Sequence, residues 1–182
     1  MADDVVRAAL DDAGVKYCLI GAHALSAWGF TRYTADIDYL TLDHRVLSRA
    51  FWPAACASRI DALRRGDEGD PLAGVARFKD PAIDIVVGRG RLVREAIETA
   101  VLDELLQVRV PTPLCLSLLK LEAGSPSDVG DVFRLIETLS STAPGDDLVA
   151  QIIARVPDLS DWGKRAWGML EGHLAGRRGQ LG

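Results

Sequence analysis

The chain lacks the features that mark several classes of protein. Its three cysteines, Cys18, Cys56 and Cys115, are odd in number and widely spaced. They predict buried thiols in a reducing cytosol, and they argue against a disulfide framework or a zinc site. No apolar run approaches the roughly 20 residues of a membrane span. The acidic N-terminal segment MADDVVRAALDDAG lacks the basic start and long apolar stretch of a signal peptide. We therefore expect a cytoplasmic protein with no membrane partner.

Positive charge is also scarce. The chain has 21 lysines and arginines against 26 aspartates and glutamates, which gives a formal net charge of −5. This balance excludes the global basic surface that marks a general nucleic-acid binder. Apolar residues make up 48% of the 182 residues, enough to bury a core. A chain of this length is expected to form one domain, or one core with an appended helical part.

The most informative stretch begins with a short apolar run, Tyr17 to Ile20, that ends at Gly21. A helix is expected next, and then Asp36 and Asp38 open a second strand. Because residues i and i+2 of a strand point to the same face, the two carboxylates should project together. Carboxylates that close repel each other unless a cation lies between them, and Mg²⁺ (or Mn²⁺) is the natural candidate. The alternative is that the pair is only a solvated start of a strand.

The neighbouring residues favour a binding site over a solvated strand start. Gly21 leads directly into the expected helix, so backbone N–H groups are left free beside the carboxylate pair, in a geometry that suits phosphate. Arg32 and Thr34 precede Asp36 and add a cation and a hydroxyl. A carboxylate pair, a helix start and an arginine together predict a site for a metal-bound polyphosphate.

This stretch resembles the nucleotidyltransferase superfamily, which has the fold of DNA polymerase beta. The resemblance depends on Gly21-Ala22-His23-Ala24, Gly29 and Arg32-x-Thr34-x-Asp36-Ile37-Asp38. The spacing is most similar to the AbiEii-like group of bacterial toxin and abortive-infection transferases, and lincosamide and aminoglycoside nucleotidyltransferases have a similar layout.

The resemblance implies that nucleotide and phosphate are bound by a short set of residues: Gly21, Ala22, His23, Arg32 and Thr34. Ala22 departs from the family, which usually has glycine or serine there, so any hydroxyl contact to a phosphate is missing. Backbone amides, His23 or Ser26 would have to replace it. The alternative roles for His23 are helix capping and core packing.

Asp84 interrupts the apolar, β-branched run from Ile83 to Val87. Burying a carboxylate in such a strand is costly unless it has a partner. One interpretation pairs Asp84 with an arginine such as Arg77. The resemblance implies another, in which Asp84 is the third carboxylate on a neighbouring strand. On that reading Asp36, Asp38 and Asp84 are the catalytic residues and the ligands of two metal ions.

Lys120 and Asp128 lie on two successive expected helices, in a segment that resembles the family ending K-L-x-A-G…D-x-x-D, with Asp131 as its last residue. The resemblance implies that Lys120 reaches the active site and holds a triphosphate, with Asp128 in the same nucleotide site. Ser125 and Ser127 stand where the family has basic residues, which would weaken nucleotide affinity. The alternative is that Lys120 is a surface lysine whose stem covers apolar surface.

These patterns and the resemblance predict an α/β (α+β) minimal nucleotidyltransferase fold, with a short mixed, twisted sheet flanked by helices. The core would span residues 1–111, and a helical C-terminal part, residues 112–182, would pack on it. Residues 43–57 are predicted as a helix interrupted near Pro53, and residues 105–110 as one short strand.

The predicted function is metal-dependent transfer of a nucleotidyl group from an NTP to an acceptor, which is an RNA (tRNA among them), a protein or a small molecule. The AbiEii-like resemblance implies a toxin–antitoxin or abortive-infection setting, with a cognate antitoxin or regulator protein as partner. Two alternatives remain open. One is a weakly active or inactive protein of this fold that binds a partner, which Ala22, Ser125 and Ser127 favour. The other is an antibiotic nucleotidyltransferase.

Overall fold

A computed structural model describes residues 2–68, 70–142 and 147–178. Two compact units make up the chain. The first comprises Met1–Ala24 and Arg32–Pro111, and the second comprises Leu25–Thr31 and Thr112–Gly182. The boundary between the units after Pro111 coincides with the predicted end of the core. The second unit also includes Leu25–Thr31, a segment that was predicted to belong to the core. The packing of residues 112–182 on the core stays a prediction.

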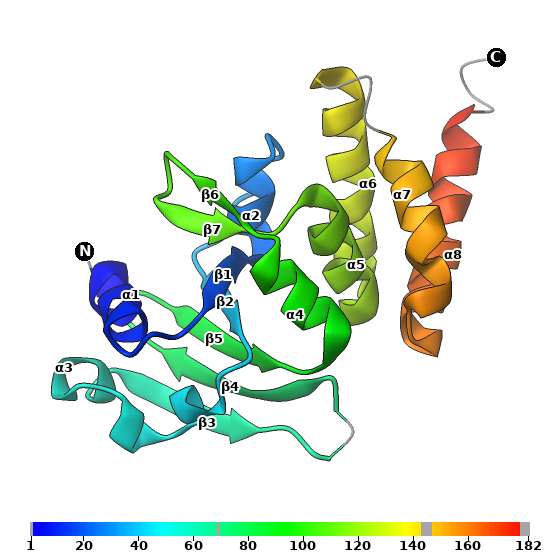
Figure 1. Ribbon diagram of the computed structural model, residues 1–182. Coiled ribbons are helices and arrows are strands. Elements are labelled where there is room, and N and C mark those ends of the chain that lie inside the picture. Colours follow the sequence, from blue (N-terminus) through cyan, green and yellow to red (C-terminus); the bar gives the residue numbers. More distant parts are fainter. Residues whose placement is uncertain (1, 69, 143–146, 179–182) are drawn as a thin grey trace. The chain divides into compact units, whose positions relative to one another are not determined.

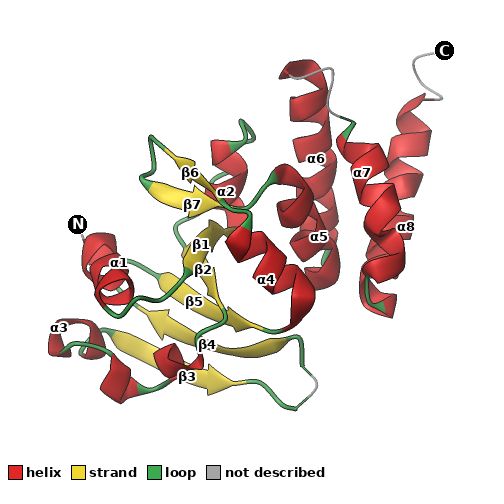
Figure 2. Ribbon diagram, in the orientation of Figure 1, coloured by secondary structure: helices red, strands yellow, loops and turns green. Residues whose placement is uncertain are grey.

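A five-stranded mixed sheet lies at the centre of the first unit, in the order β1-β2-β5-β4-β3 (Figure 1). Strands β2 and β5 are parallel, and the other neighbouring strands are antiparallel. The strands are β1 (Tyr17–Ile20), β2 (Ile37–Thr41), β3 (Ile60–Arg65), β4 (Leu72–Phe78) and β5 (Ile83–Gly88). The helices around it match the predicted class, a mixed sheet flanked by helices (Figure 2).

The remaining elements of the first unit are short. Strands β6 (Val101–Asp103) and β7 (Val108–Val110) pair as an antiparallel hairpin. The sequence had predicted a single strand over residues 105–110. The helices are α1 (Ala2–Asp12), α2 (Gly21–Ala27, which continues into the second unit), η1 (His44–Leu47), η2 (Arg49–Phe51), α3 (Ala54–Ala57) and α4 (Gly90–Glu98).

The two faces of the sheet differ in composition because strand residues alternate between them. Ile83, Ile85 and Val87 of β5 are fully buried, and Phe78 of β4 packs its ring 4.7 Å from the ring of Trp52. Asp84 lies between two of these buried residues and faces the other side, where it is only half-buried. The alternation therefore places the acidic residue of β5 on the face opposite the aromatic core.

Residues 43–57 do not form the predicted helix but two 3₁₀ turns and one short α-helix. The Asp43 side chain accepts a hydrogen bond from the Arg45 backbone N–H and so starts the first turn. The indole of Trp52 donates to the carbonyl oxygen of Val46 at 2.8 Å, which holds the segment bent over the sheet. Pro53 precedes α3 as its N-cap residue. Proline cannot continue a helix from the preceding turn, which explains the break.

Four helices form the second unit: α5 (Pro113–Ala123), α6 (Pro126–Thr142), α7 (Leu148–Arg155) and α8 (Asp161–Arg178), with the 3₁₀ turn η3 (Val156–Asp158) between the last two. Thr112 caps α5 by accepting from the Cys115 backbone N–H, as its hydroxyl predicted. Gly124 ends α5 with a left-handed φ of 66°, and a Cβ there would lie 2.0 Å from the Trp162 indole nitrogen.

The three cysteines are buried free thiols, as predicted from their spacing. In the part of the chain that the structure describes, no helix has both the length and the apolar character needed to cross a membrane.

Candidate active site

Three charged residues form a row across neighbouring strands of the sheet. The register pairs Asp38 of β2 with Asp84 of β5, and Asp84 in turn with Arg77 of β4. Residues paired directly across strands project from the same face, and neighbouring strands lie about 4.8 Å apart. The structure therefore brings two of the predicted site aspartates together, because Asp38 and Asp84 are the second residues of two neighbouring parallel strands.

Arg77 holds Asp84 through two hydrogen bonds. Its Nε donates to Oδ1 at 2.7 Å, and its Nη2 donates to Oδ2 at 2.5 Å. The Asp84 side chain is 15% exposed and the Arg77 side chain 51% exposed, so the pair lies at the edge of solvent. The hydrogen bonds from Arg77 to Asp84, and then the charge of Asp84, raise the pKa of Arg77, and the charges of Asp36 and Asp61 raise it further. Of the two interpretations of Asp84, the arginine partner is thus present in the structure.

Gly21 leaves room for the Asp38 carboxylate. Its φ is +69°, a left-handed conformation that side chains rarely adopt, and a Cβ built there would lie only 2.3 Å from Oδ2 of Asp38. Ile20, one residue earlier, is the register partner of Asp38 in the antiparallel pair of β1 and β2. The glycine that ends β1 is therefore needed for two reasons, its backbone conformation and the close approach of this carboxylate.

A side-chain turn leads the chain into β2. The Asp36 backbone N–H donates to the Thr34 hydroxyl at 3.2 Å, so this hydroxyl orders the turn that presents Asp36. Asp36 and Arg32 are both exposed. Asp36 is close enough to act electrostatically on Arg77. Arg77 therefore interacts with Asp84 through hydrogen bonds and with Asp36 electrostatically.

Ala22 and His23 differ in their surroundings. Ala22 is buried, 4% exposed, so its methyl group packs into the interior and contributes no polar contact. His23 is half-buried. The phosphate-binding roles that the resemblance implies for Gly21, Ala22, His23, Arg32 and Thr34 stay predictions.

Three carboxylates do not converge as the resemblance implied. Among residues 2–68, 70–142 and 147–178, no three His, Cys, Asp or Glu side chains form a group that could hold a metal ion. Asp36 precedes the first residue of β2, and both Asp84 oxygens are engaged by Arg77. Asp36 and Asp38 still supply the hard carboxylate oxygens that Mg²⁺ prefers, and Mg²⁺ commonly takes one or two carboxylates together with substrate phosphate. The chemistry of these two donors, both carboxylates, therefore suits one ion of this kind.

Lys120 is a buried cation of the second unit, and the surface-lysine alternative is wrong. Its side chain is 9% exposed, and its Nζ lies 3.0 Å from Oδ1 of Asp128 and 2.8 Å from Oδ2 of Asp131. The Ser125 hydroxyl accepts from the Asp128 backbone N–H at 3.1 Å and donates to Oδ2 of Asp128 at 2.5 Å. This exchange is a capping arrangement at the start of α6. Lys120 thus balances two carboxylates inside its own unit, and Ser125 has a structural role.

A separate cavity of about 500 Å³ lies in the first unit, but none of the predicted site residues lines it. Arg7, Asp11 and Tyr17 are among its lining residues. Burial raises the pKa of the Tyr17 phenol, and a hydrogen bond with Arg7 partly opposes that rise. Arg7 also donates to the backbone carbonyl oxygen of Gln107 and so ties α1 to the β6–β7 hairpin.

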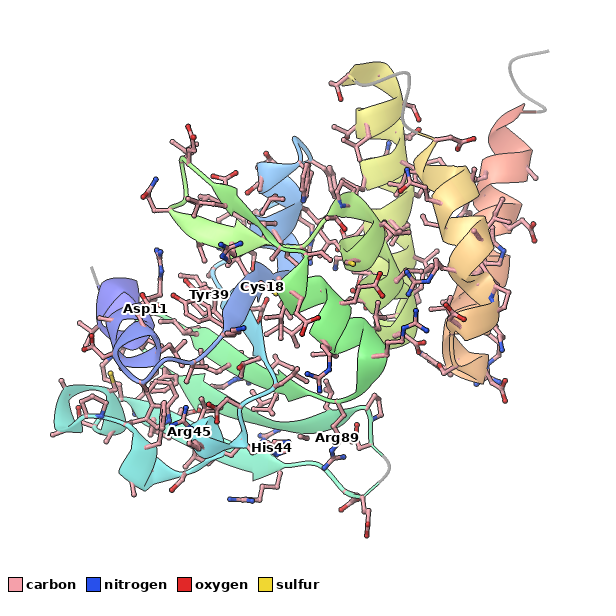
Figure 3. The ribbon with its side chains drawn as sticks, in the orientation of Figure 1. Asp11, Cys18, Tyr39, His44, Arg45 and Arg89 are labelled. Atoms are coloured by element: carbon pink, nitrogen blue, oxygen red, sulfur yellow. The ribbon has the colours of Figure 1, made fainter. Side chains whose placement is uncertain are left out.

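Arg89, which follows the last residue of β5, fixes the loop between β3 and β4. Its Nη1 donates to the backbone carbonyl oxygens of Asp67 and Asp70, at 2.8 and 2.6 Å. Figure 3 shows its side chain beside this loop. The loop residues that the structure describes are therefore tied to the end of β5 by a backbone-directed arginine.

Comparisons with known proteins agree with this architecture. The sequence matches no protein-family model and no curated protein. Among solved structures, the chain is similar to a solution structure of the antibiotic-resistance factor ANT(2'')-Ia, with a TM-score of 0.53 and 15% sequence identity over 96% of this chain and 95% of that one. It is also similar to a crystal structure of ANT(2'')-Ia in complex with adenylyl-2''-tobramycin, with a TM-score of 0.54 and 17% identity over 84% and 93% of the two chains. The likeness shows that this chain shares its fold with ANT(2'')-Ia.

Proposed function

We propose that this protein is a metal-dependent nucleotidyltransferase, which moves a nucleotidyl group from an NTP to an acceptor. The observation that carries the proposal is the register of β2 and β5, which sets Asp38 beside Asp84 on one face of a sheet with a nucleotidyltransferase-like fold. Asp36 lies two residues before Asp38, directly before the first residue of β2. We call these three aspartates, Asp36, Asp38 and Asp84, the acidic edge. Clustered carboxylates of this kind attract a divalent cation and, with it, a polyphosphate.

Each residue at this edge has a role in the proposal. Asp36 and Asp38 would hold Mg²⁺ or Mn²⁺, which when bound neutralises charge on the triphosphate and polarises its phosphorus–oxygen bonds. Gly21 keeps side-chain atoms out of the space beside Asp38. Arg32, on the segment before β2, supplies a cation to the phosphates, and preorganised cations stabilise charge that develops during transfer. Thr34 orders the turn that presents Asp36.

The acceptor is proposed by class. RNA, protein and small molecules all offer hydroxyl groups, and the neighbour ANT(2'')-Ia was solved with an adenylylated tobramycin, so an aminoglycoside is one acceptor to test. The spacing from Gly21 to Asp38 favours the AbiEii-like group, and with it a cognate antitoxin or regulator protein as partner. The AbiEii-like group and its partner protein are what the family resemblance of this stretch implies.

One specific observation favours the alternative of a catalytically weak, partner-binding protein. Arg77 engages both oxygens of Asp84, and Asp128 and Asp131 engage Lys120, so two groups with predicted catalytic or nucleotide roles are already paired. In this alternative the protein uses its surface to bind a partner, and the acidic edge binds no nucleotide.

Calorimetric titration with a non-hydrolysable NTP and Mg²⁺ distinguishes the two. We expect binding to the wild-type chain, and weaker binding to Arg32→Ala because a charge-assisted contact to phosphate contributes about 1.5–3 kcal/mol. Arg65→Ala, which removes an exposed arginine from the end of β3, is the matched control and should bind like the wild type. Absence of binding to all four NTPs at millimolar concentration would favour the partner-binding alternative.

A further inference from the structure

A positive charge, that of Arg77, lies among the carboxylates at the acidic edge. Asp36, Asp38 and Asp84 each carry a negative charge, and Arg77 contributes one positive charge through its contact with Asp84 and its electrostatic interaction with Asp36. A guanidinium stays protonated in proteins, so this positive charge is permanent. These four groups together carry two net negative charges, equal and opposite to the charge of one divalent cation.

The geometry of the ion pair makes Arg77 a competitor for any cation at Asp84. The planar guanidinium meets the carboxylate side by side, through Nε to Oδ1 at 2.7 Å and Nη2 to Oδ2 at 2.5 Å. This two-point contact is the strong form of an arginine–carboxylate pair. A metal ion at Asp84 would have to displace at least one of these hydrogen bonds, and it would then lie next to a fixed positive charge.

The register keeps Arg77 at this place. Arg77 of β4 is the direct cross-strand neighbour of Asp84, and the residues on either side of it, Ala76 and Phe78, are buried on the opposite face. Because a one-residue slip would turn every side chain of β4 to the other face, the guanidinium cannot leave the row without loss of the core. Only a change of the Arg77 side-chain rotamer can move the guanidinium away from Asp84.

We propose that Arg77 takes the place of a second metal ion at Asp84, so that the site binds one divalent cation, held by Asp36 and Asp38. This inference rests on the proposed function, since it assumes that Asp36 and Asp38 bind a metal. It differs from the two-metal arrangement that the resemblance implied, in which Asp84 is a ligand of the second ion. Arg77 is a charge-balancing residue here, acting through Asp84.

The number of Mn²⁺ ions bound per chain tests the inference without any need for activity. Mn²⁺ is titrated into the purified full chain and counted by electron paramagnetic resonance of the free ion. We expect one bound ion for the wild type and two for Arg77→Met, which keeps an apolar stem but frees Asp84. Two Mn²⁺ ions held roughly 3.5–4 Å apart, as in two-metal sites, should also show spin coupling in the bound spectrum.

Arg64→Met is the matched control, because Arg64 is an exposed arginine on the neighbouring strand β3 and its loss changes the net charge equally. It should bind one ion. If Arg77→Met does not fold without metal, Asp84→Asn replaces it, and this variant should still bind one ion because Asp84 is not a ligand of that ion.

Each other outcome is informative. Two ions on the wild type, one ion on a folded Arg77→Met, or loss of the ion in Asp84→Asn would overturn the inference, while the proposed function would stand. No bound ion on the wild type or on any variant would overturn the metal-dependent function itself, and the inference with it.

Discussion

Asp38→Asn should reduce nucleotidyl transfer by about a thousandfold or more, because a metal ion contributes several kcal/mol of charge stabilisation in the transition state and each 1.4 kcal/mol is a factor of ten. Asparagine keeps the size of the side chain and its place beside Gly21 but removes one of the two charges that hold the ion. The fold should persist, since no backbone group changes and the charge repulsion near Asp36 falls. Transfer of labelled nucleotide is the measurement, with the unfolding temperature measured alongside.

Asp61→Asn is the control for this variant. Asp61 is exposed on β3 and also acts electrostatically on Arg77, so its replacement removes the same charge from the same sheet. It should transfer nucleotide like the wild type. Equal activity, or an equal growth phenotype, for the wild type and Asp38→Asn would contradict the enzymatic account and favour a partner-binding role.

Lys120→Met should destabilise the protein by about 3–5 kcal/mol, since removal of one partner from a buried ion pair leaves uncompensated buried charge. Here the loss would leave two carboxylates, Asp128 and Asp131, facing each other with no cation between them. For a chain of this size the unfolding temperature should fall by roughly 6–20 °C. Methionine keeps the apolar stem, so packing changes little. Thermal unfolding followed by circular dichroism measures the effect.

Two further variants show whether the effect comes from the buried charges. Lys164→Met removes an exposed lysine from α8 of the same unit and should change the unfolding temperature little. Asp131→Asn added to Lys120→Met should recover part of the lost stability, because one of the uncompensated charges is gone. An unchanged unfolding temperature for Lys120→Met, together with lost NTP binding, would return Lys120 to the triphosphate role that the resemblance implied.

Several strands of the sheet could be predicted because their signals are local. The alternation in Ile83–Val87 identified a strand with one polar residue, which the structure contains as β5. The i, i+2 spacing of Asp36 and Asp38 predicted both on one face of a strand, but β2 begins at Ile37, so Asp36 precedes the strand. The threonine–proline start of α5 and the glycine after it also gave that helix its bounds. Each of these features depends on neighbours in the chain, so the sequence contains the needed information.

The segment from residue 43 to residue 57 was predicted wrongly because tertiary contacts decide its conformation. Its apolar residues have helical spacing, but Trp52 bonds to the backbone of Val46 and packs its ring on Phe78, from a distant strand. The β6–β7 hairpin was missed for a related reason. Its strands have only three residues each, too few for a period to be read from the sequence.

The ion-pair partners of Arg77 and Lys120 could be identified only from the folded structure. Arg77 was one candidate partner for Asp84, and only the register of β4 against β5 makes it the neighbour. For Lys120 the sequence offered a surface position or a triphosphate site, and neither anticipated a buried contact with Asp131. Ion pairs across elements depend on how helices and strands pack, and spacing along the chain does not determine that packing.

The most direct test of the central claim is to follow the α-phosphate of the nucleotide. The wild-type chain is incubated with Mg²⁺, a cell extract or an aminoglycoside, and each NTP labelled in turn at the α- or the γ-phosphate. Nucleotidyl transfer predicts that label from the α-phosphate appears on an RNA, a protein or a small molecule, that γ-label leaves as pyrophosphate, and that Asp38→Asn shows neither. Label carried over from the γ-phosphate, or no transfer of α-label from any NTP, would contradict the account.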